Sequence, residues 1–139
     1  MSVKQLWLNL PVKNIERSKK FFLDIGFREN PIHKDSLNLV GLLIGNQDFV
    51  LMLFPEEDFK SFANHEVSDT EKGSEMLINI DAQSKEEVDE MEALVRKAGG
   101  EVYQSATVSQ SWLYGFGFKD LDGHRWAVIY MDLGKMPRG

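Results

Sequence analysis

The sequence repeats one order of secondary-structure signals twice, and this repeat limits the possible folds more than any other feature. Residues 5–10 alternate polar and apolar side chains, as a strand with one buried face does, and Asn14 follows as the cap of a helix over 15–24. Residues 75–81 alternate in the same way, and Ser84 opens a second helix with a capping box. Two copies of one supersecondary unit are therefore predicted.

Each predicted helix is followed by segments rich in β-forming residues. The predicted later strands are 37–44 and 49–54 in the first half, and 101–105, 112–119 and 125–131 in the second. We therefore predict an α+β fold in which two strand–helix–strand–strand–strand modules form a single domain over 1–139. Module one covers about 3–54, a linker covers 55–74, and module two covers about 75–132.

Composition excludes several classes of partner and chemistry. The 22 acidic and 16 basic residues give a net charge of −6, which argues against binding to nucleic acid. The longest apolar run, 49–54, is too short to span a membrane, and residues 1–6 lack the basic and apolar stretches that predict a secretory signal. The absence of cysteine excludes disulfides and thiolate catalysis. We expect a cytoplasmic protein that binds neither nucleic acid nor a membrane.

Two motifs resemble those of the vicinal oxygen chelate superfamily, which includes glyoxalase I, bleomycin resistance proteins and extradiol dioxygenases. The first is Asn-Leu-Pro-Val-Lys-Asn-Ile-Glu-Arg-Ser-Lys-Lys-Phe-Phe over 9–22, followed by Ile-Gly-Phe over 25–27. The second is the acidic turn Phe-Lys-Asp-Leu-Asp-Gly-His-Arg-Trp over 118–126. The resemblance implies two βαβββ modules whose curved mixed sheet encloses a cup, and assembly as a homodimer.

The resemblance also implies where the divalent metal of the family's enzymes would be held. Counting from the helix caps and the last turn places the ligand positions at Trp7, Leu77 and Ala127, with Met52 as the repeat partner of Ala127. None of these side chains offers the nitrogen or oxygen donor that such ions need. We therefore expect no metal and no cofactor, which puts glyoxalase and dioxygenase chemistry in doubt.

Without a metal, the predicted inner face is apolar at its centre and has polar groups around it, which is typical of small-molecule sites. The candidate ligand-binding residues are Gln5, Trp7, Asn9, Met52, Phe59, Phe62, Glu75, Leu77, Asn79, Trp112, Tyr114, Arg125 and Ala127. Glu75 is also the one candidate catalytic residue, as a general acid. Plain packing of the core is the alternative interpretation of the apolar positions among them.

Three functions remain open on these observations. The first is a metal-independent protein of the bleomycin-resistance type, a dimer that binds a small organic ligand. The second is an enzyme, either a glyoxalase-like lyase or a dioxygenase with a shifted metal site, or one that uses acid–base chemistry. The third is a scaffold without a small-molecule site. The missing metal ligands favour the first.

Overall fold

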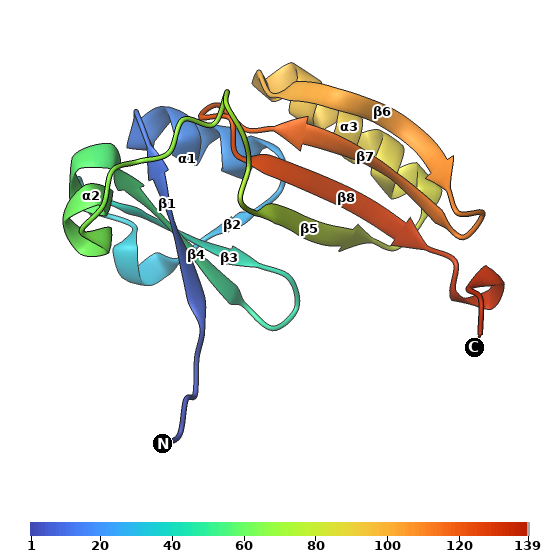
Figure 1. The fold of residues 1–139 in the computed structure, drawn as a ribbon, viewed down its shortest axis with the longest axis horizontal. Helices are drawn as coiled ribbons and strands as arrows, with labels where there is room; N and C mark the ends of the chain where they lie inside the picture. Colours follow the sequence, from blue (N-terminus) through green and yellow to red (C-terminus); the bar gives the residue numbers. More distant parts are fainter. Residues whose placement is uncertain (139) are drawn as a thin grey trace. The chain divides into compact units, whose positions relative to one another are not determined.

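Two four-stranded sheets, each built from the strands of one half of the chain, make up the computed structural model, which describes residues 1–138 (Figure 1). The chain divides into unit 1, Met1–Asp69, and unit 2, Thr70–Gly139. Each sheet mixes one parallel strand pair with two antiparallel pairs. The predicted α+β fold with two βαβββ modules is thereby confirmed, whereas the enclosing cup stays a prediction.

Unit 1 has the strand order β1-β4-β3-β2, with β1 parallel to β4. Its elements are β1 (Trp7–Val12), α1 (Ile15–Asp24), β2 (Arg28–Glu29), the 3₁₀ helix η1 (Pro31–His33), β3 (Val40–Ile44), β4 (Phe49–Pro55) and α2 (Glu56–Ala63). The Asn14 side chain accepts a hydrogen bond from the Arg17 N–H at 3.0 Å and so starts α1 where the sequence predicts it. Gly26, at φ 108°, follows its end.

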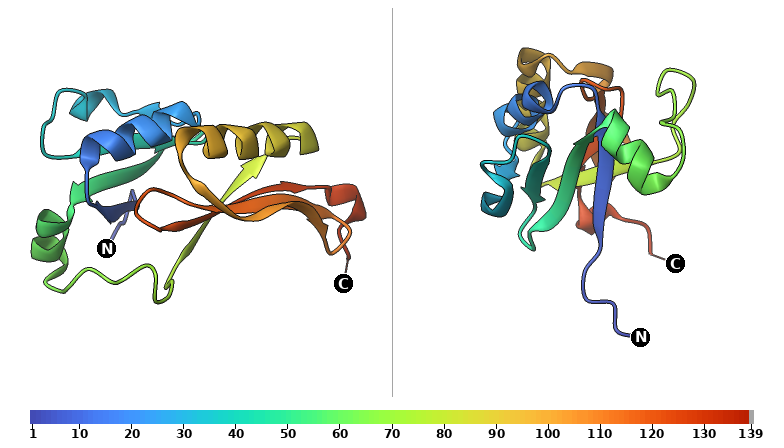
Figure 2. Two further views of the ribbon diagram at one scale, coloured as in Figure 1. Left: turned by 90° about the horizontal axis from the view of Figure 1, so that it is seen from above. Right: turned by 90° about the vertical axis from the view of Figure 1, so that its left-hand side faces the viewer.

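Helix α1 packs on one face of its sheet, and this face carries the core of unit 1 (Figure 2). Alternate residues of β1 and β4 point into this core, together with the two phenylalanines of α1. The buried side chains include Leu10, Val12, Phe21, Phe22, Leu42, Leu51 and Leu53. The opposite face of the sheet is left for other contacts.

Unit 2 repeats this arrangement with the strand order β5-β8-β7-β6. Its elements are β5 (Leu77–Ala82), α3 (Lys85–Ala98), β6 (Glu101–Ser109), β7 (Leu113–Lys119), β8 (Arg125–Met131) and the 3₁₀ helix η2 (Leu133–Lys135). Helix α3 lies along one face of the sheet (Figure 2) and covers the buried Phe118 and Trp126, whose rings stack with centroids 5.9 Å apart.

A buried carboxylate holds the turn before β8. Asp120 accepts hydrogen bonds from the backbone N–H groups of Asp122 and His124, both at 3.0 Å, and from the indole N–H of Trp126 at 3.1 Å. Burial raises the pKa of the Asp120 carboxyl above its ordinary value, although the charge of His124 and these hydrogen bonds act in the opposite direction. The acidic turn of the second motif is therefore a structural anchor.

The first strand of each unit begins two residues later than predicted. In the register of the parallel pairs, Gln5 would stand beside Asp48 and Glu75 beside Gly123. Asp48 and Gly123 both have positive φ and belong to the turns before β4 and β8, so they offer no strand to pair with. The alternating sequence pattern therefore begins two residues before the strand pairing does, and Gln5 and Glu75 lie outside the paired strands.

Among residues 1–138, no helix combines the length and the apolar character that crossing a membrane requires.

Candidate functional site

The four positions at which the resemblance implies metal ligands lie in equivalent places of the two sheets. Asn9 pairs with Met52 between β1 and β4, and Asn79 pairs with Ala127 between β5 and β8. Trp7 and Leu77 lie two residues before these asparagines, on the same face of each strand. Each sheet thus has an open face, which we define as the face opposite α1 in unit 1 and the face opposite α3 in unit 2.

The side chains at these positions do not fit a divalent metal. An indole, a thioether, a butyl and a methyl group supply no nitrogen or oxygen donor for Zn²⁺, Mn²⁺ or Fe²⁺. Nor do residues 1–138 contain a group of three or more His, Cys, Asp or Glu side chains that could hold an ion. No metal-dependent step can therefore be assigned to these residues.

A groove of about 860 Å³ follows the open face of unit 1. Its lining residues are Lys4, Gln5, Leu6, Trp7, Asn30, Ile32, His33, Leu43, Gln47, Asp48, Phe49, Val50, Met52 and Phe54. Trp7 is 55% exposed although it is a large apolar side chain, whereas Met52 is 8% exposed. The groove thus offers a wide apolar surface with polar groups at its rim.

The polar end of this groove is built by the segment around η1. The Asn30 side chain accepts a hydrogen bond from the Ile32 N–H at 3.1 Å and caps η1, while the Asn30 N–H donates to the Gly41 carbonyl at 2.8 Å. A Cβ at position 41 would lie 2.9 Å from Cδ2 of His33 and 3.4 Å from Sδ of Met52. Glycine therefore lets the imidazole lie close against β3.

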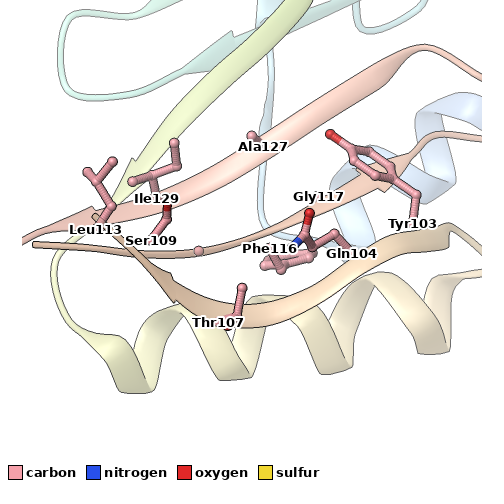
Figure 3. A pocket seen from close by; sticks show the side chains of 10 residues that line it. Tyr103, Gln104, Thr107, Ser109, Leu113, Phe116, Gly117, Ala127 and Ile129 are labelled. Carbon is pink, nitrogen blue, oxygen red and sulfur yellow. The ribbon is translucent and has the colours of Figure 1, made fainter. Parts of the chain in front are cut away.

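A smaller groove of about 230 Å³ lies on the open face of unit 2. Figure 3 shows the side chains of Tyr103, Ala127 and Ile129 on the sheet face away from α3. Gly115 and Gly117 form part of its floor, and Gln104, Thr107 and Ser109 bring polar groups from β6, which is an edge strand. Leu113 and Phe116 complete the lining.

Tyr103 covers the centre of the β7 strand. Its ring occupies the space that a Cβ at Gly117 would need, and its hydroxyl donates to the Trp126 carbonyl at 3.2 Å. The Arg125 guanidinium lies 4.5 Å from the centroid of the same ring. Tyr103 is therefore held by β7, by β8 and by a stacked cation.

The structure brings only some of the predicted ligand residues into these grooves. Gln5, Trp7 and Met52 line the groove of unit 1, and Ala127 lines that of unit 2. Asn9, Leu77, Asn79 and Arg125 lie on the open faces outside the two linings, and the exposed Glu75 precedes β5.

The linker helix α2 carries the two phenylalanines that the sequence places near the site. The Phe62 ring meets Phe54, a lining residue, edge to face with centroids 4.9 Å apart. Phe59 is half-buried on the same helix. A contact between this helix and the rim of the groove in unit 1 therefore exists through Phe62.

Trp112 and Tyr114 do not lie on one strand, although the predicted strand over 112–119 includes both. β7 begins at Leu113, so Trp112 lies in the preceding turn. The Tyr114 hydroxyl donates to Asp89 of α3 at 2.6 Å, which raises the pKa of this phenol. Tyr114 therefore stands on the helix side, away from the groove.

Sequence reasoning missed the glycines of the floor and the Tyr103 ring that lies over Gly117. Gly115 and Gly117 alternate with Phe116 and Phe118, and glycine inside a strand marks a place where another group approaches closely. That signal indicates that other groups come close to one side of β7. It does not identify Tyr103 as the residue that covers Gly117.

Comparisons with known proteins give structural neighbours only: no family model and no curated protein matches the sequence. A hypothetical protein from S. aureus is 32% identical, with 94% of this chain and 95% of that chain covered and a TM-score of 0.83. A glyoxalase/bleomycin resistance protein/dioxygenase family enzyme from Burkholderia phytofirmans is 19% identical, with 92% and 99% covered and a TM-score of 0.77. The fosfomycin resistance protein FosX from Listeria monocytogenes, complexed with Mn(II) and sulfate, is 19% identical, with 97% and 95% covered and a TM-score of 0.68.

Proposed function

The chain belongs by its fold to the vicinal oxygen chelate superfamily, and from that premise we propose that it binds a small organic molecule directly on its open faces, without a metal ion. The observation that carries the proposal is the side-chain chemistry at four equivalent positions, Trp7, Met52, Leu77 and Ala127. They present apolar surface where metal binding would need nitrogen or oxygen. A bound molecule would then be held by apolar contact and a few hydrogen bonds.

The groove of unit 1 supports this proposal most directly. Trp7 leaves more than half of its surface exposed beside Val50, Met52 and Phe54, although covering an aromatic side chain is worth about 1.5–3 kcal/mol. Polar groups of Asn30 and the imidazole of His33 stand at one end, where they could orient a ligand. Exposed apolar area of this kind is common at binding sites.

The proposal extends to assembly and location. We propose a homodimer in the cytoplasm, with residues 1–139 acting as one domain, on the strength of the family resemblance. Glu75 stays the candidate general acid of an enzymatic alternative, but it is exposed, lies before β5 and lines neither groove. Its position gives that alternative no support.

A fragment screen by two-dimensional NMR on the isotope-labelled chain tests the proposal. We expect neutral aromatic and aliphatic fragments to shift the signals of Trp7, Met52 or Gly117, and to leave helix-face signals such as those of Tyr114 unchanged. Trp7→Ala serves as the site variant, and Leu94→Ala, an exposed change on α3, as its control. Fragments that shift only helix-face signals, or none at all, would contradict a ligand site on the open faces.

Metal analysis provides the second arm. Purified protein offered Mn²⁺, Zn²⁺ and Fe²⁺ is expected to retain less than one equivalent after dialysis, and fragment binding is expected to be unchanged by added chelator. Stoichiometric uptake, together with fragment binding that depends on the ion, would instead favour the lyase or dioxygenase with a shifted site.

A further inference from the structure

Two cations stand next to each other on the open face of unit 2, and only one of them is neutralised. Lys119 and Arg125 are direct partners in the β7–β8 register. The Lys119 ammonium forms an ion pair with Glu101 at 2.5 Å, whereas Arg125 forms no ion pair within residues 1–138. The partner of Arg125 on its other side is the apolar Leu77.

The Arg125 guanidinium is nevertheless held in place. It lies 4.5 Å from the centroid of the Tyr103 ring, and the Tyr103 hydroxyl is bound to the Trp126 carbonyl. A guanidinium stacked on an aromatic ring keeps its edge N–H groups free, because stacking uses only the planar face. Those N–H groups match the two oxygens of a carboxylate in a bidentate contact.

The groove beside Tyr103 provides room for the rest of such a molecule. Its volume of about 230 Å³ lies below the range of drug-sized sites, so a small body is favoured. Gly117 is covered by the Tyr103 ring and Gly115 lies against Ile129, and Ala127 and Ile129 add apolar surface beside them. Gln104 and Thr107 supply hydrogen-bonding groups at the β6 edge.

We propose that the ligand of unit 2 is a small carboxylate with a flat apolar body, whose carboxylate binds the Arg125 guanidinium and whose body lies in the groove beside the Tyr103 ring. This inference rests on the proposed function, because it names the chemical class of a ligand bound on the open face. The negative net charge of the chain does not oppose it, because Arg125 provides a local positive site that Glu101 does not neutralise.

Matched pairs of acid and amide test the ligand class. Benzoate and benzamide have nearly the same shape and differ in charge, and phenylacetate and phenylacetamide form a second pair. Dissociation constants are measured by NMR titration, following the amide signals of Gly115 and Gly117 and the Nε–H signal of Arg125. We expect each acid to bind about tenfold more tightly than its amide at low salt, with the preference falling as salt is added.

Variants identify the cation responsible. Arg125→Gln is expected to abolish the preference for the acid, and Arg125→Lys, which keeps the charge but not the planar fork, to retain only part of it. The double change Lys119→Gln with Glu101→Gln removes the neighbouring ion pair as a unit, and it is expected to leave the preference unchanged. Circular dichroism of each variant establishes that it folds.

The outcomes separate this inference from the proposed function. If acid and amide bind equally well to the groove, or if the preference survives Arg125→Gln, the carboxylate class is wrong while binding on the open face stands. If neither charged nor neutral probes shift any open-face signal, the proposed function itself fails and this inference fails with it.

Discussion

At equivalent positions of their sheets, the two units each have a glycine with an aromatic ring packed against it, but the ring differs. Gly41 of β3 stands beside β4 with the His33 imidazole close to it, and Gly117 of β7 stands beside β8 under the Tyr103 ring. Each glycine lacks the Cβ that would keep the ring away. Both units thus have a glycine at the same strand position, while the ring that lies against the glycine differs.

The residues around the two grooves also differ in charge. Val50, the partner of Trp7 in unit 1, corresponds in register to Arg125, the partner of Leu77 in unit 2. Unit 1 thus presents a large apolar surface with no cation at this position, and unit 2 presents a smaller surface with a stacked guanidinium. The duplicated framework carries two different binding surfaces.

The largest expected effect comes from filling the bare position in unit 2. Gly117→Ala would place a Cβ where the Tyr103 ring lies, so the ring must leave β7 and lose its hydrogen bond to Trp126. We expect a loss of about 3 kcal/mol in the free energy of unfolding, at the upper end of overpacking effects. Urea-induced unfolding followed by circular dichroism measures it.

The double variant Gly117→Ala with Tyr103→Ala is the control, because it removes the ring with which the new methyl group collides. The cost of Gly117→Ala is expected to fall below about 1 kcal/mol in that background. Gly41→Ala should cost less than Gly117→Ala, since the imidazole edge at 2.9 Å has to move only a little. Equal costs in both backgrounds would show that Tyr103 does not set the requirement for glycine.

An intermediate effect is expected from the turns that precede β4 and β8. Asp120→Asn removes a charged acceptor of three hydrogen bonds, and an amide nitrogen cannot accept the Trp126 indole N–H. We expect a loss of about 2 kcal/mol at neutral pH. Asp48→Asn in the matching turn breaks only the exposed ion pair with Arg28 and should cost less than about 1 kcal/mol.

The stability difference between wild type and Asp120→Asn should also depend on pH, and the direction of that dependence tests the raised pKa of Asp120. Burial raises the folded-state pKa of this carboxyl above its unfolded-state pKa. Its contribution to stability is then full below the unfolded-state pKa and is lost as the pH rises through the folded-state pKa. The difference in unfolding free energy between wild type and Asp120→Asn should therefore grow as the pH falls from about 7 toward about 4. A difference that shrinks over this range would contradict the raised pKa.

Local signals made most of the fold predictable from the sequence. The predicted helix over 15–24 matches α1, because its cap and terminal glycine lie within the segment itself, and the predicted strand over 125–131 matches β8. The starts of β1 and β5 were not predictable from alternation, since they depend on the turns at Asp48 and Gly123. A strand can start only where its partner strand is available for pairing.

The site was less predictable for a related reason. The places of Trp7 and Met52 in the groove of unit 1 follow from counting along regular strands. Tyr103 instead reaches Gly117 through an irregularity in β6, where the register shifts between Val102 and Gln104. Such bulges redirect side chains according to tertiary packing, which alternation alone does not reveal.

The smallest expected effect comes from the hydroxyl that distinguishes the ring of unit 2. Tyr103→Phe keeps the ring over Gly117 and under Arg125 and removes only the 3.2 Å hydrogen bond to the Trp126 carbonyl. Because this bond is long and Tyr103 is partly exposed, we expect a loss of about 0.5 kcal/mol in the free energy of unfolding. The same urea titration measures it. If Tyr103→Phe costs as much as Gly117→Ala, the hydroxyl rather than the ring anchors this surface, and the two units differ by a hydrogen bond and not by the shape of their covering rings.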